Sequence, residues 1–226
     1  MEYPRISEAI FLKRPNRFIA EIDIAGQTEI CHVKNTGRCR ELLLPGAKIL
    51  IQEAHNPQRK TKYDLISVWK GQKLINMDAQ APNQVFGQWL PQSGLFQQLT
   101  LVRPEKSFGN SRFDFYIEAD GDKIFAEIKG VTLEENGVAR FPDAPTERGV
   151  KHLRELIRCH QMGFDAYVVF IIQMANLRYF EPNWLVHPQF GQALTEAHKQ
   201  GVHLLALDCL VTENTICANH AVEIRL

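Results

Sequence analysis

The sequence predicts a mixed α/β (α+β) protein in two parts: a small β-barrel or sandwich over residues 1–82 and a layered α/β domain over residues 83–226. Two observations support this division. Short runs of alternating apolar and polar residues that end at turn residues dominate the first part, as in small all-β domains. Helical and strand patterns alternate in the second part, which is typical of helices packed on a sheet.

About five short strands are expected in the first part. The segment RFIAEIDIAG (17–26) alternates apolar and polar residues and stops at a glycine. Further strands are expected within TEICHV (28–33), AKILIQEA (47–54) and YDLISVWKGQKLINMD (63–78), the last divided by a turn at Lys70–Gly71. The segment KNTGRCRELLLPG between the second and third of these runs is rich in turn residues, so we expect a loop there.

Helices and strands follow one another in the second part. Residues 81–99 indicate one or two short helices, broken by Pro91 and Gly94. A strand near 100–105 then precedes the hairpin RFDFYIEADGDKIFAEIKG (112–130). The remaining predictions are a loop over 132–145, a helix over 146–162 that ends before Gly163, a strand over 165–173 buried on both faces, a helix over 190–201 and a last strand over 202–210.

Composition limits the classes of protein. No apolar run approaches 18 residues and the N-terminus has no export signal, so we expect a cytoplasmic protein whose five cysteines are reduced thiols. The net charge is zero, which argues against nucleic-acid binding by bulk attraction. The first part carries a net +4 and the second a net −4. This asymmetry allows phosphate contacts in the first part, although it is modest for a chain of this length.

The hairpin places acids opposite one another. Asp120–Gly121 is a strong signal for a two-residue turn. With that turn, the numbers of opposed residues sum to 241, so Asp114 faces Glu127 and Arg112 faces Lys129, all four on one face. A turn centred on Gly121–Asp122 would instead place Asp114 opposite Lys129. The other face is apolar and is expected to be a core face: Phe113, Phe115, Ile117, Ile124, Ala126 and Ile128.

Two directly opposed carboxylates destabilise a sheet unless something compensates. A divalent cation, Mg²⁺ or Mn²⁺, would hold both acids ionised, and Glu105 could supply a third acid. With Lys129 beside them, these are the groups that phosphodiester hydrolysis needs: a metal to activate water and a lysine to orient the nucleophile. The alternative is a solvated face on which Arg112 and Lys129 neutralise the acids as surface pairs.

Basic residues gather at three other places. On the predicted helix 146–162, Arg148, Lys151 and Arg158 form a stripe with Arg154 at its edge. Two loops add Lys34, Arg38 and Arg40, and Arg59, Lys60 and Lys62. These groups suggest phosphate contacts, and ordinary charged surfaces are the alternative. The eight histidines lack a metal-binding spacing, so we expect His32, His152 and His160 to be structural. The sequence has no P-loop, no G-x-G-x-x-G and no G-x-S-x-G motif.

The stretches RPNRFIAEI, HVKNTGRCRELLLPG, SRFDFYIE…FAEIKGVTL and FPDAPTERGVKHLREL resemble the sugar fermentation stimulation protein A (SfsA) family. The resemblance implies an N-terminal OB-like β-barrel followed by a PD-(D/E)XK nuclease-like α/β domain. It matches Glu105, Asp114, Glu127 and Lys129 to the nuclease signature. It also implies DNA binding without sequence preference and a possible role in regulating sugar (maltose) metabolism.

The leading hypothesis is a DNA-binding protein with a metal-dependent nuclease centre. Asp114, Glu127 and the Ile128 carbonyl would hold Mg²⁺ or Mn²⁺, and Lys129 would position or activate water. Glu105 would bind the metal indirectly or help to orient Lys129. The rival is a DNA-binding regulator that no longer cuts, and a sugar-binding protein finds little support. The DNA strand state and the oligomeric state stay open. Expected nucleic-acid contacts are Lys34, Asn35, Arg38, Arg59, Lys60, Arg112, Arg148 and Lys151.

Overall fold

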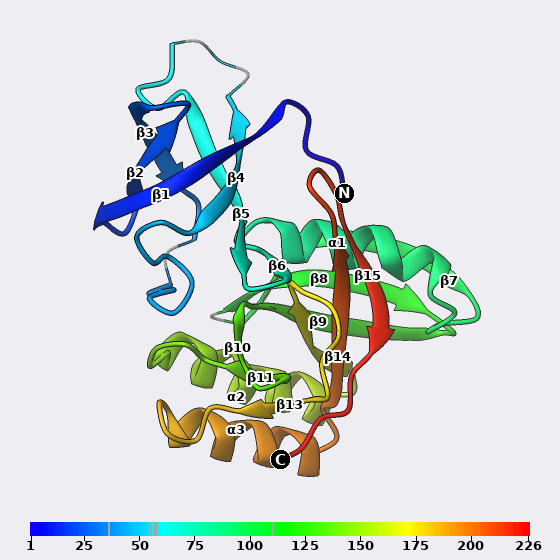
Figure 1. Cartoon of the computed structure of the whole chain (residues 1–226). Coiled ribbons are helices and arrows are strands. Elements are labelled where there is room, and N and C mark those ends of the chain that lie inside the picture. The colour runs from blue at the N-terminus through cyan, green and yellow to red at the C-terminus, as the bar shows by residue number, and fades with distance from the viewer. Residues whose placement is uncertain (36, 55, 57, 110) are drawn as a thin grey trace.

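The computed structural model describes residues 1–35, 37–54, 56, 58–109 and 111–226. A small barrel and a larger α/β unit lie against each other, and both chain termini lie on the α/β unit (Figure 1). The predicted mixed α/β class is therefore confirmed. Within the described residues, no helix has the length and apolar character needed to cross a membrane.

The barrel is a six-stranded sheet in the order β3-β2-β1-β4-β5-β6, closed by pairing of β3 with β5. All the predicted strands form, but β1 was not predicted. Its sequence gives a weak signal because only Ala9 and Phe11 of its eleven residues are buried. The strands are β1 (Ile6–Asn16), β2 (Ile19–Ile24), β3 (Gln27–Val33), β4 (Lys48–Glu53), β5 (Tyr63–Lys70) and β6 (Lys73–Asn76).

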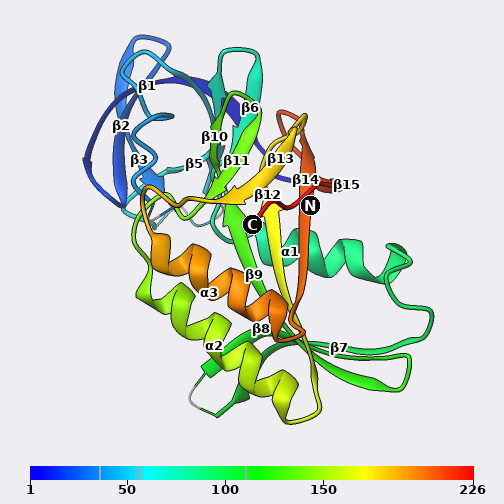
Figure 2. The same ribbon diagram turned by 90° about the horizontal axis from the view of Figure 1, so that it is seen from below.

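The α/β unit is a six-stranded mixed sheet in the order β15-β14-β12-β9-β8-β7. Helix α1 covers one face, and α2 and α3 lie side by side on the other (Figure 2). Its elements are α1 (Ala81–Trp89), the 3₁₀ turn η1 (Leu90–Gln92), β7 (Leu99–Phe108), β8 (Ser111–Ala119), β9 (Asp122–Val131), α2 (Glu147–Gln161), β12 (Asp165–Ile172), α3 (Pro188–Lys199), β14 (His203–Val211) and β15 (Ile216–Ala221).

The prediction of a plain loop over 132–145 is wrong. This segment contains the strands β10 (Leu133–Glu135) and β11 (Val138–Phe141), which pair with each other, and β11 pairs in parallel with β13 (Tyr179–Pro182). Strands of three and four residues are too short for periodicity to identify, and the partner of β11 lies about forty residues further along the chain. The edge strand β15 was missed as well.

Helix α2 begins and ends where the sequence predicts. The Thr146 hydroxyl caps its start by accepting the backbone N–H of Gly149 at 3.0 Å. Glu147 lies in the first turn and Arg158 in the last, so both charges interact favourably with the helix dipole. The chain leaves the helix at Gly163, whose φ of +87° favours glycine. Helix α2 is thereby fixed over the sheet beside β8, β9 and β12.

The β8–β9 hairpin has the predicted turn, and the predicted register holds from the turn to the pair Phe115–Ala126, whereas the predicted pairs Asp114–Glu127 and Arg112–Lys129 are not among the strand pairs. Asp120 and Gly121 have positive φ, and Phe115 pairs with Ala126, so opposed numbers sum to 241. The prediction that Phe113 shares a face with Phe115 is wrong. Phe115 packs in the apolar cluster on the α1 side, whereas Phe113 packs in the cluster on the α2 side and lies against His152. The alternation of β8 is therefore broken at the residue between them, Asp114.

The far end of β9 passes close to the connection between barrel and sheet. A Cβ atom on Gly130 would lie 2.7 Å from Pro82 Cγ and 2.7 Å from Gln173 Oε1. Gln173 is buried, and its side-chain amide donates to Asn76 Oδ1 and to the Asp78 carbonyl, which ties the end of β12 to this connection. Only glycine at position 130 leaves room for β9 to approach both Pro82, in α1, and Gln173, at the end of β12.

We therefore expect Gly130→Ala to lower the free energy of unfolding by about 1–3 kcal/mol through overpacking. Urea denaturation measures this directly. Gly87→Ala is the matched control because a Cβ there would make ordinary contacts at 3.5 Å with Phe115 and would add helix propensity in α1. A Gly130→Ala protein as stable as the wild type would contradict the close approach.

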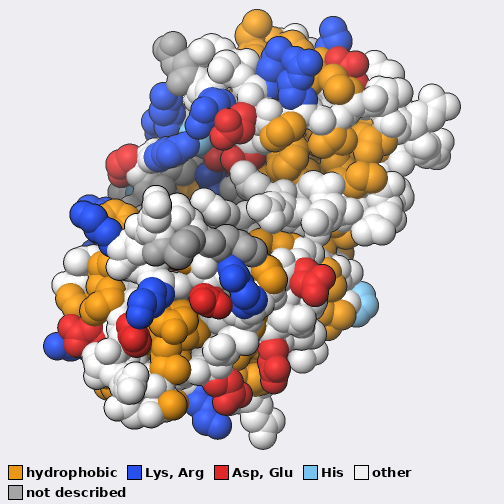
Figure 3. Space-filling model, turned by 90° about the horizontal axis from the view of Figure 1, so that it is seen from above, with side chains coloured by type: hydrophobic (Ala, Val, Ile, Leu, Met, Phe, Trp, Pro, Cys, Tyr) orange, Lys and Arg blue, Asp and Glu red, His pale blue; other side chains and the backbone are white. Residues whose placement is uncertain are grey.

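Basic and acidic side chains intermingle over the face of the molecule drawn in Figure 3. The net +4 and −4 of the two parts of the chain therefore do not give this face a single sign. Electrostatic binding of a polyanion has to be argued from local groups of side chains.

Candidate functional site

Asp114 lies where β8 separates from β9. The backbone pairing of the two strands is described from the turn as far as Phe115 and Ala126. Beyond that pair, Asp114 Oδ2 accepts the backbone N–H of Ile128 at 2.8 Å. Asp114 Oδ1 accepts from the side-chain amide of Asn83, in the first turn of α1, at 3.0 Å. The carboxylate thus occupies the opening between the two strands and is oriented from two sides.

Glu127 is buried on β9 and uses only one of its two oxygens. Lys129 Nζ donates to Glu127 Oε1 at 2.6 Å, and His152 Nδ1, from α2, bonds to the same oxygen. Glu127 Oε2 is buried and has no hydrogen-bond partner within the described part of the chain. A buried carboxylate oxygen without a partner is costly, and such an atom is suited to bind a water or an ion.

The hydrogen bonds of His152 fix its proton. Arg148 Nε donates to His152 Nε2 at 3.4 Å, so Nε2 is an acceptor and Nδ1 carries the hydrogen that goes to Glu127. Helix α2 therefore holds the Glu127 carboxylate in one orientation through a buried imidazole. The sequence predicts only a structural role for His152. The available signal was a polar residue on the buried flank of α2, next to Leu153.

The two acids respond differently to their surroundings. Burial raises the pKa of Asp114, and the negative charge of the nearby Glu127 raises it further. Hydrogen bonds from the Ile128 N–H and Asn83, and the charge of Lys129, lower this pKa but do not cancel the rise. Burial would also raise the pKa of Glu127, but the His152 hydrogen bond and the Lys129 charge together hold that pKa below its usual range. The surroundings therefore favour the ionised form of Glu127, and its charge opposes ionisation of Asp114.

These donors fit a hard divalent cation. Glu127 Oε2 lacks a partner among the described residues, Asp114 lies within electrostatic reach, and the Ile128 carbonyl follows Glu127 on the same strand, β9. Across the described residues, no three His, Cys, Asp or Glu side chains form a metal-holding group. A site with two carboxylates suits Mg²⁺ or Mn²⁺ rather than zinc, because Mg²⁺ keeps several of its waters.

The Glu105 side chain does not join the carboxylates of Asp114 and Glu127. It lies opposite Asp114 in the β7–β8 register, between the pairs Pro104–Phe115 and Lys106–Phe113, and has a left-handed φ of +56°. Its carboxylate lies 3.5 Å from Arg112 Nη1, and both side chains are exposed. Strand β7 at Glu105 and strand β8 at Asp114 are thus both irregular, and these two residues lie opposite each other. The roles predicted for Glu105 and Arg112 stay predictions.

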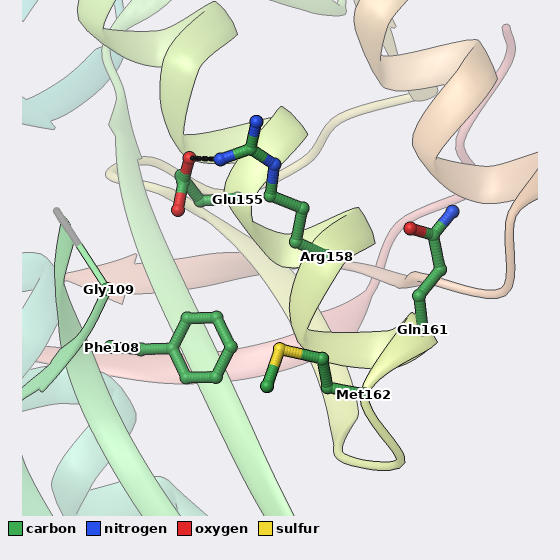
Figure 4. A pocket seen from close by; sticks show the side chains of 6 residues that line it. All are labelled: Phe108, Gly109, Glu155, Arg158, Gln161 and Met162. Carbon is green, nitrogen blue, oxygen red and sulfur yellow. Dashed lines mark hydrogen bonds and ion pairs between the residues drawn. The ribbon is translucent and has the colours of Figure 1, made fainter.

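The exposed face of α2 carries basic side chains on either side of the buried His152. Arg148, Lys151 and Arg154 border a hollow of about 420 Å³ on this face. A neighbouring cavity of about 420 Å³ lies between the β7–β8 turn and the end of α2, lined by Phe108 and Met162 (Figure 4). Arg158 contributes to both hollows and is paired with Glu155 at 2.9 Å. The predicted stripe therefore exists, and Glu155 neutralises the charge of Arg158 within it.

In the barrel, two predicted nucleic-acid contacts are engaged inside the protein. Arg59 donates to both carboxylate oxygens of buried Asp64, at 2.7 and 2.9 Å. Lys34 Nζ lies 3.7 Å from Asp64 and 3.3 Å from Asp78, and His32 bonds to Asp64 as well. Of the other predicted contacts, Asn35 caps the Gly37 N–H, whereas Arg38 and Lys60 are exposed.

We expect the Asp64 pairs to stabilise the barrel in a pH-dependent way. Burial would raise the pKa of Asp64, but the Arg59 hydrogen bonds and the Lys34 charge lower it overall. A lowered folded-state pKa contributes stability above the unfolded pKa of about 3.9, and this contribution is lost as the pH falls through the folded value. Asp64→Asn should therefore cost about 1–3 kcal/mol at pH 7 and less at pH 2.5.

Urea denaturation at both pH values checks this expectation. Glu53→Gln is the matched control and should change little at either pH, because among the described residues the Glu53 side chain makes only an exposed pair with Arg5 at 3.9 Å. A loss of stability in Asp64→Asn that is equal at pH 7 and pH 2.5 would contradict the ion-pair explanation.

Comparison with known families identifies both parts of the chain. Residues 12–77 match the family model described as "SfsA N-terminal OB domain". Residues 80–215 match the model described as "Sugar fermentation stimulation protein RE domain". The predicted fold class, an OB-like barrel followed by a nuclease-like α/β domain, is confirmed.

Similar proteins extend over the whole chain. A "Sugar fermentation stimulation protein homolog" of Desulfitobacterium hafniense strain Y51 is 62% identical over 226 residues, covering 100% of this chain and 99% of the relative. A homolog of the same description from Ruminiclostridium cellulolyticum is 55% identical and covers 100% of both. The solved structure of Pyrococcus furiosus SfsA in complex with Ca²⁺ has a TM-score of 0.91 at 29% identity, covering 100% of this chain and 98% of that one.

Proposed function

This chain belongs to the SfsA family, and from that premise we propose that it is a metal-dependent nuclease, cutting nucleic acid without sequence preference. The observation that carries the proposal is the buried Glu127 Oε2, which has no partner within the described residues while Lys129 and His152 occupy the other oxygen. A carboxylate held in this way is prepared to bind a cation.

Asp114, Glu127 and the Ile128 carbonyl would hold Mg²⁺ or Mn²⁺. When bound, the metal would lower the pKa of a coordinated water and neutralise charge on the phosphoryl oxygens. The P. furiosus relative, which is described with Ca²⁺, supports a site for hard divalent cations in this family.

The side chains of the protein have separate tasks around that site. Lys129 is held at 2.6 Å from Glu127 and would orient the attacking water or stabilise charge on the phosphate. Asn83 and the Ile128 N–H hold Asp114, and His152 holds Glu127. Arg148 and Lys151, on the exposed face of α2, would contact phosphates on either side of the scissile bond.

DNA is the proposed substrate and the cytoplasm the proposed location. All five cysteines are free thiols, which suits a reducing compartment. The alternative is a DNA-binding regulator of sugar (maltose) metabolism that no longer cuts. The retained acids argue against it, because a protein that only binds DNA would gain affinity by losing negative charge at the contact surface.

The test is incubation of the purified chain with single-stranded DNA, duplex DNA, flap DNA and RNA, each with Mg²⁺, Mn²⁺ or chelator. We expect cleavage of at least one DNA substrate that requires metal and is lost in Asp114→Asn. Asp122→Asn, an exposed acid at the start of β9, is the matched control and should retain cleavage. Binding that survives chelation without cleavage of any substrate would favour the regulator.

A further inference from the structure

The barrel contains a cationic hollow away from Asp114 and Glu127. It lies between the β1–β2 turn and the loop after β3 and has a volume of about 310 Å³. Four arginines line it, together with Asn16, Gly37, Cys39 and Leu43. We call it the arginine hollow, after Arg14, Arg17, Arg38 and Arg40.

Arg14 builds the hollow by holding its two loops together. Its guanidinium donates to four backbone carbonyls, those of Asn35, Gly37 and Arg38 in one loop and Arg17 in the other, at 2.7–2.9 Å. Its Nε is buried and has no partner among the described residues. The loop is also fixed from behind, since a Cβ on Gly37 would lie 2.6 Å from Asp143 Oδ2. The arrangement is therefore a built feature of the barrel.

The four arginines of the hollow outnumber the acids near it, since two carboxylates, those of Asp143 and Glu41, lie within electrostatic reach of Cys39 in its lining. Within the described residues, none of its arginines forms an ion pair with an acid, and the nearby Asp143 carboxylate accepts the backbone N–H of Arg38 at 3.0 Å. Arg17, Arg38 and Arg40 are exposed. By contrast, the second basic group of the barrel, Lys34 and Arg59, is paired with buried acids. Four like charges around one hollow repel one another, and an anion relieves that repulsion.

The neighbouring residues indicate which anion. Phe18, next to Arg17, is 48% exposed, and the Arg17 guanidinium lies 5.3 Å from its ring centroid. Cationic grooves beside exposed aromatic rings bind single-stranded nucleic acid, because the cations contact phosphates and the ring stacks on an unpaired base. Asp143 connects the hollow to the segment just before α2, so a bound strand could continue toward Arg148.

We propose that the arginine hollow binds backbone phosphates of single-stranded nucleic acid, with a base against Phe18. The choice of nucleic acid as the ligand rests on the proposed function, but binding at the arginine hollow does not require cleavage at Asp114 and Glu127. Binding is therefore measured in chelator, by fluorescence anisotropy of a labelled single-stranded DNA of about 20 nucleotides. Failure of this site and failure of the nuclease proposal are then separate results.

The test variant is Arg38→Gln/Arg40→Gln, which leaves Arg14 in place. We expect roughly tenfold weaker binding and a slope of log affinity against log salt that falls by about 1.4, for two lost phosphate contacts. The matched control is Arg103→Gln/Lys123→Gln, which removes two exposed cations from the β7–β9 region. It should retain nearly all the affinity. Phe18→Leu should weaken binding of the single strand more than binding of duplex DNA.

Equal losses in the two double variants would reduce the effect to net charge and overturn the proposal. So would an unchanged affinity in Arg38→Gln/Arg40→Gln. Calorimetry with inorganic phosphate provides the remaining arm. If the arginine variant loses phosphate binding but keeps oligonucleotide affinity, the hollow belongs to a small phosphate ligand and the proposal is wrong. Thermal melts of all variants confirm that the barrel remains folded.

Discussion

Lys129→Met is expected to reduce metal-dependent cleavage by at least about 100-fold, the usual cost of removing one preorganised charge from an active site. The Lys129 ammonium lies 2.6 Å from Glu127 Oε1, and its side chain is only 14% exposed, so neither solvent nor a neighbour would replace it easily. Metal affinity should be retained or rise slightly, because the variant removes a positive charge beside the carboxylates. Initial cleavage rates and metal titrations, measured on the same preparation, separate the two effects.

Lys123→Met is the matched control, since Lys123 lies on the same strand but is exposed and distant from the acids. It should cut at nearly the wild-type rate. A Lys129→Met protein that loses metal binding together with cleavage would contradict the role assigned to Lys129. The lysine would then act by organising the carboxylates.

His152→Phe is expected to weaken metal binding by roughly 10–100-fold, the usual cost of removing a group that orients a ligand. Phenylalanine fills a similar volume beside Phe113 but has no hydrogen to give to Glu127 Oε1. Glu127 would then be held by Lys129 alone and would sample other rotamers. Isothermal titration with Mn²⁺ measures the loss without reference to cleavage.

His152→Asn is the informative companion because its amide can donate from nearly the position of Nδ1. It should recover most of the metal affinity that His152→Phe loses. Equal affinities in the phenylalanine and asparagine variants would mean that His152 serves only to fill space. Thermal melts show whether either substitution disturbs α2.

The sequence alone was sufficient for the parts of the fold that local patterns encode. The Asp120–Gly121 turn fixed the register of the hairpin, and the caps at Thr146 and Gly163 fixed α2. Other parts depend on partners far away in the chain. Strand β1 buries little of its own surface, and β11 becomes a strand only because β13 lies beside it. No local period identifies such elements.

For the candidate site, the sequence identified the residues on one hairpin but not those that orient them. Asp114, Glu127 and Lys129 follow from strand spacing. His152 and Asn83 come from two helices on opposite faces of the sheet, and only the packing of those helices brings them to the acids. The break in alternation at Asp114 could not be predicted either, since it depends on a side chain replacing a backbone acceptor for Ile128.

The same limit applies to the basic residues. Lys34 and Arg59 looked like exposed phosphate contacts because each lies in a loop rich in positive charge. Their acidic partners lie elsewhere in the chain, Asp64 on β5 and Asp78 after β6. No sequence pattern singled out Arg14, which holds two loops together through their carbonyl groups. The role of each cation was set by partners that tertiary structure supplies.

The central claim is that Glu127 Oε2 and Asp114 bind one divalent cation together. Anomalous diffraction from crystals soaked in Mn²⁺ tests it most directly. The account predicts one strong peak within about 2.6 Å of Glu127 Oε2 and in contact with Asp114, absent from crystals of Glu127→Gln. Crystals of the folded wild-type protein with no peak there, or with Mn²⁺ bound only at other acids, would contradict it.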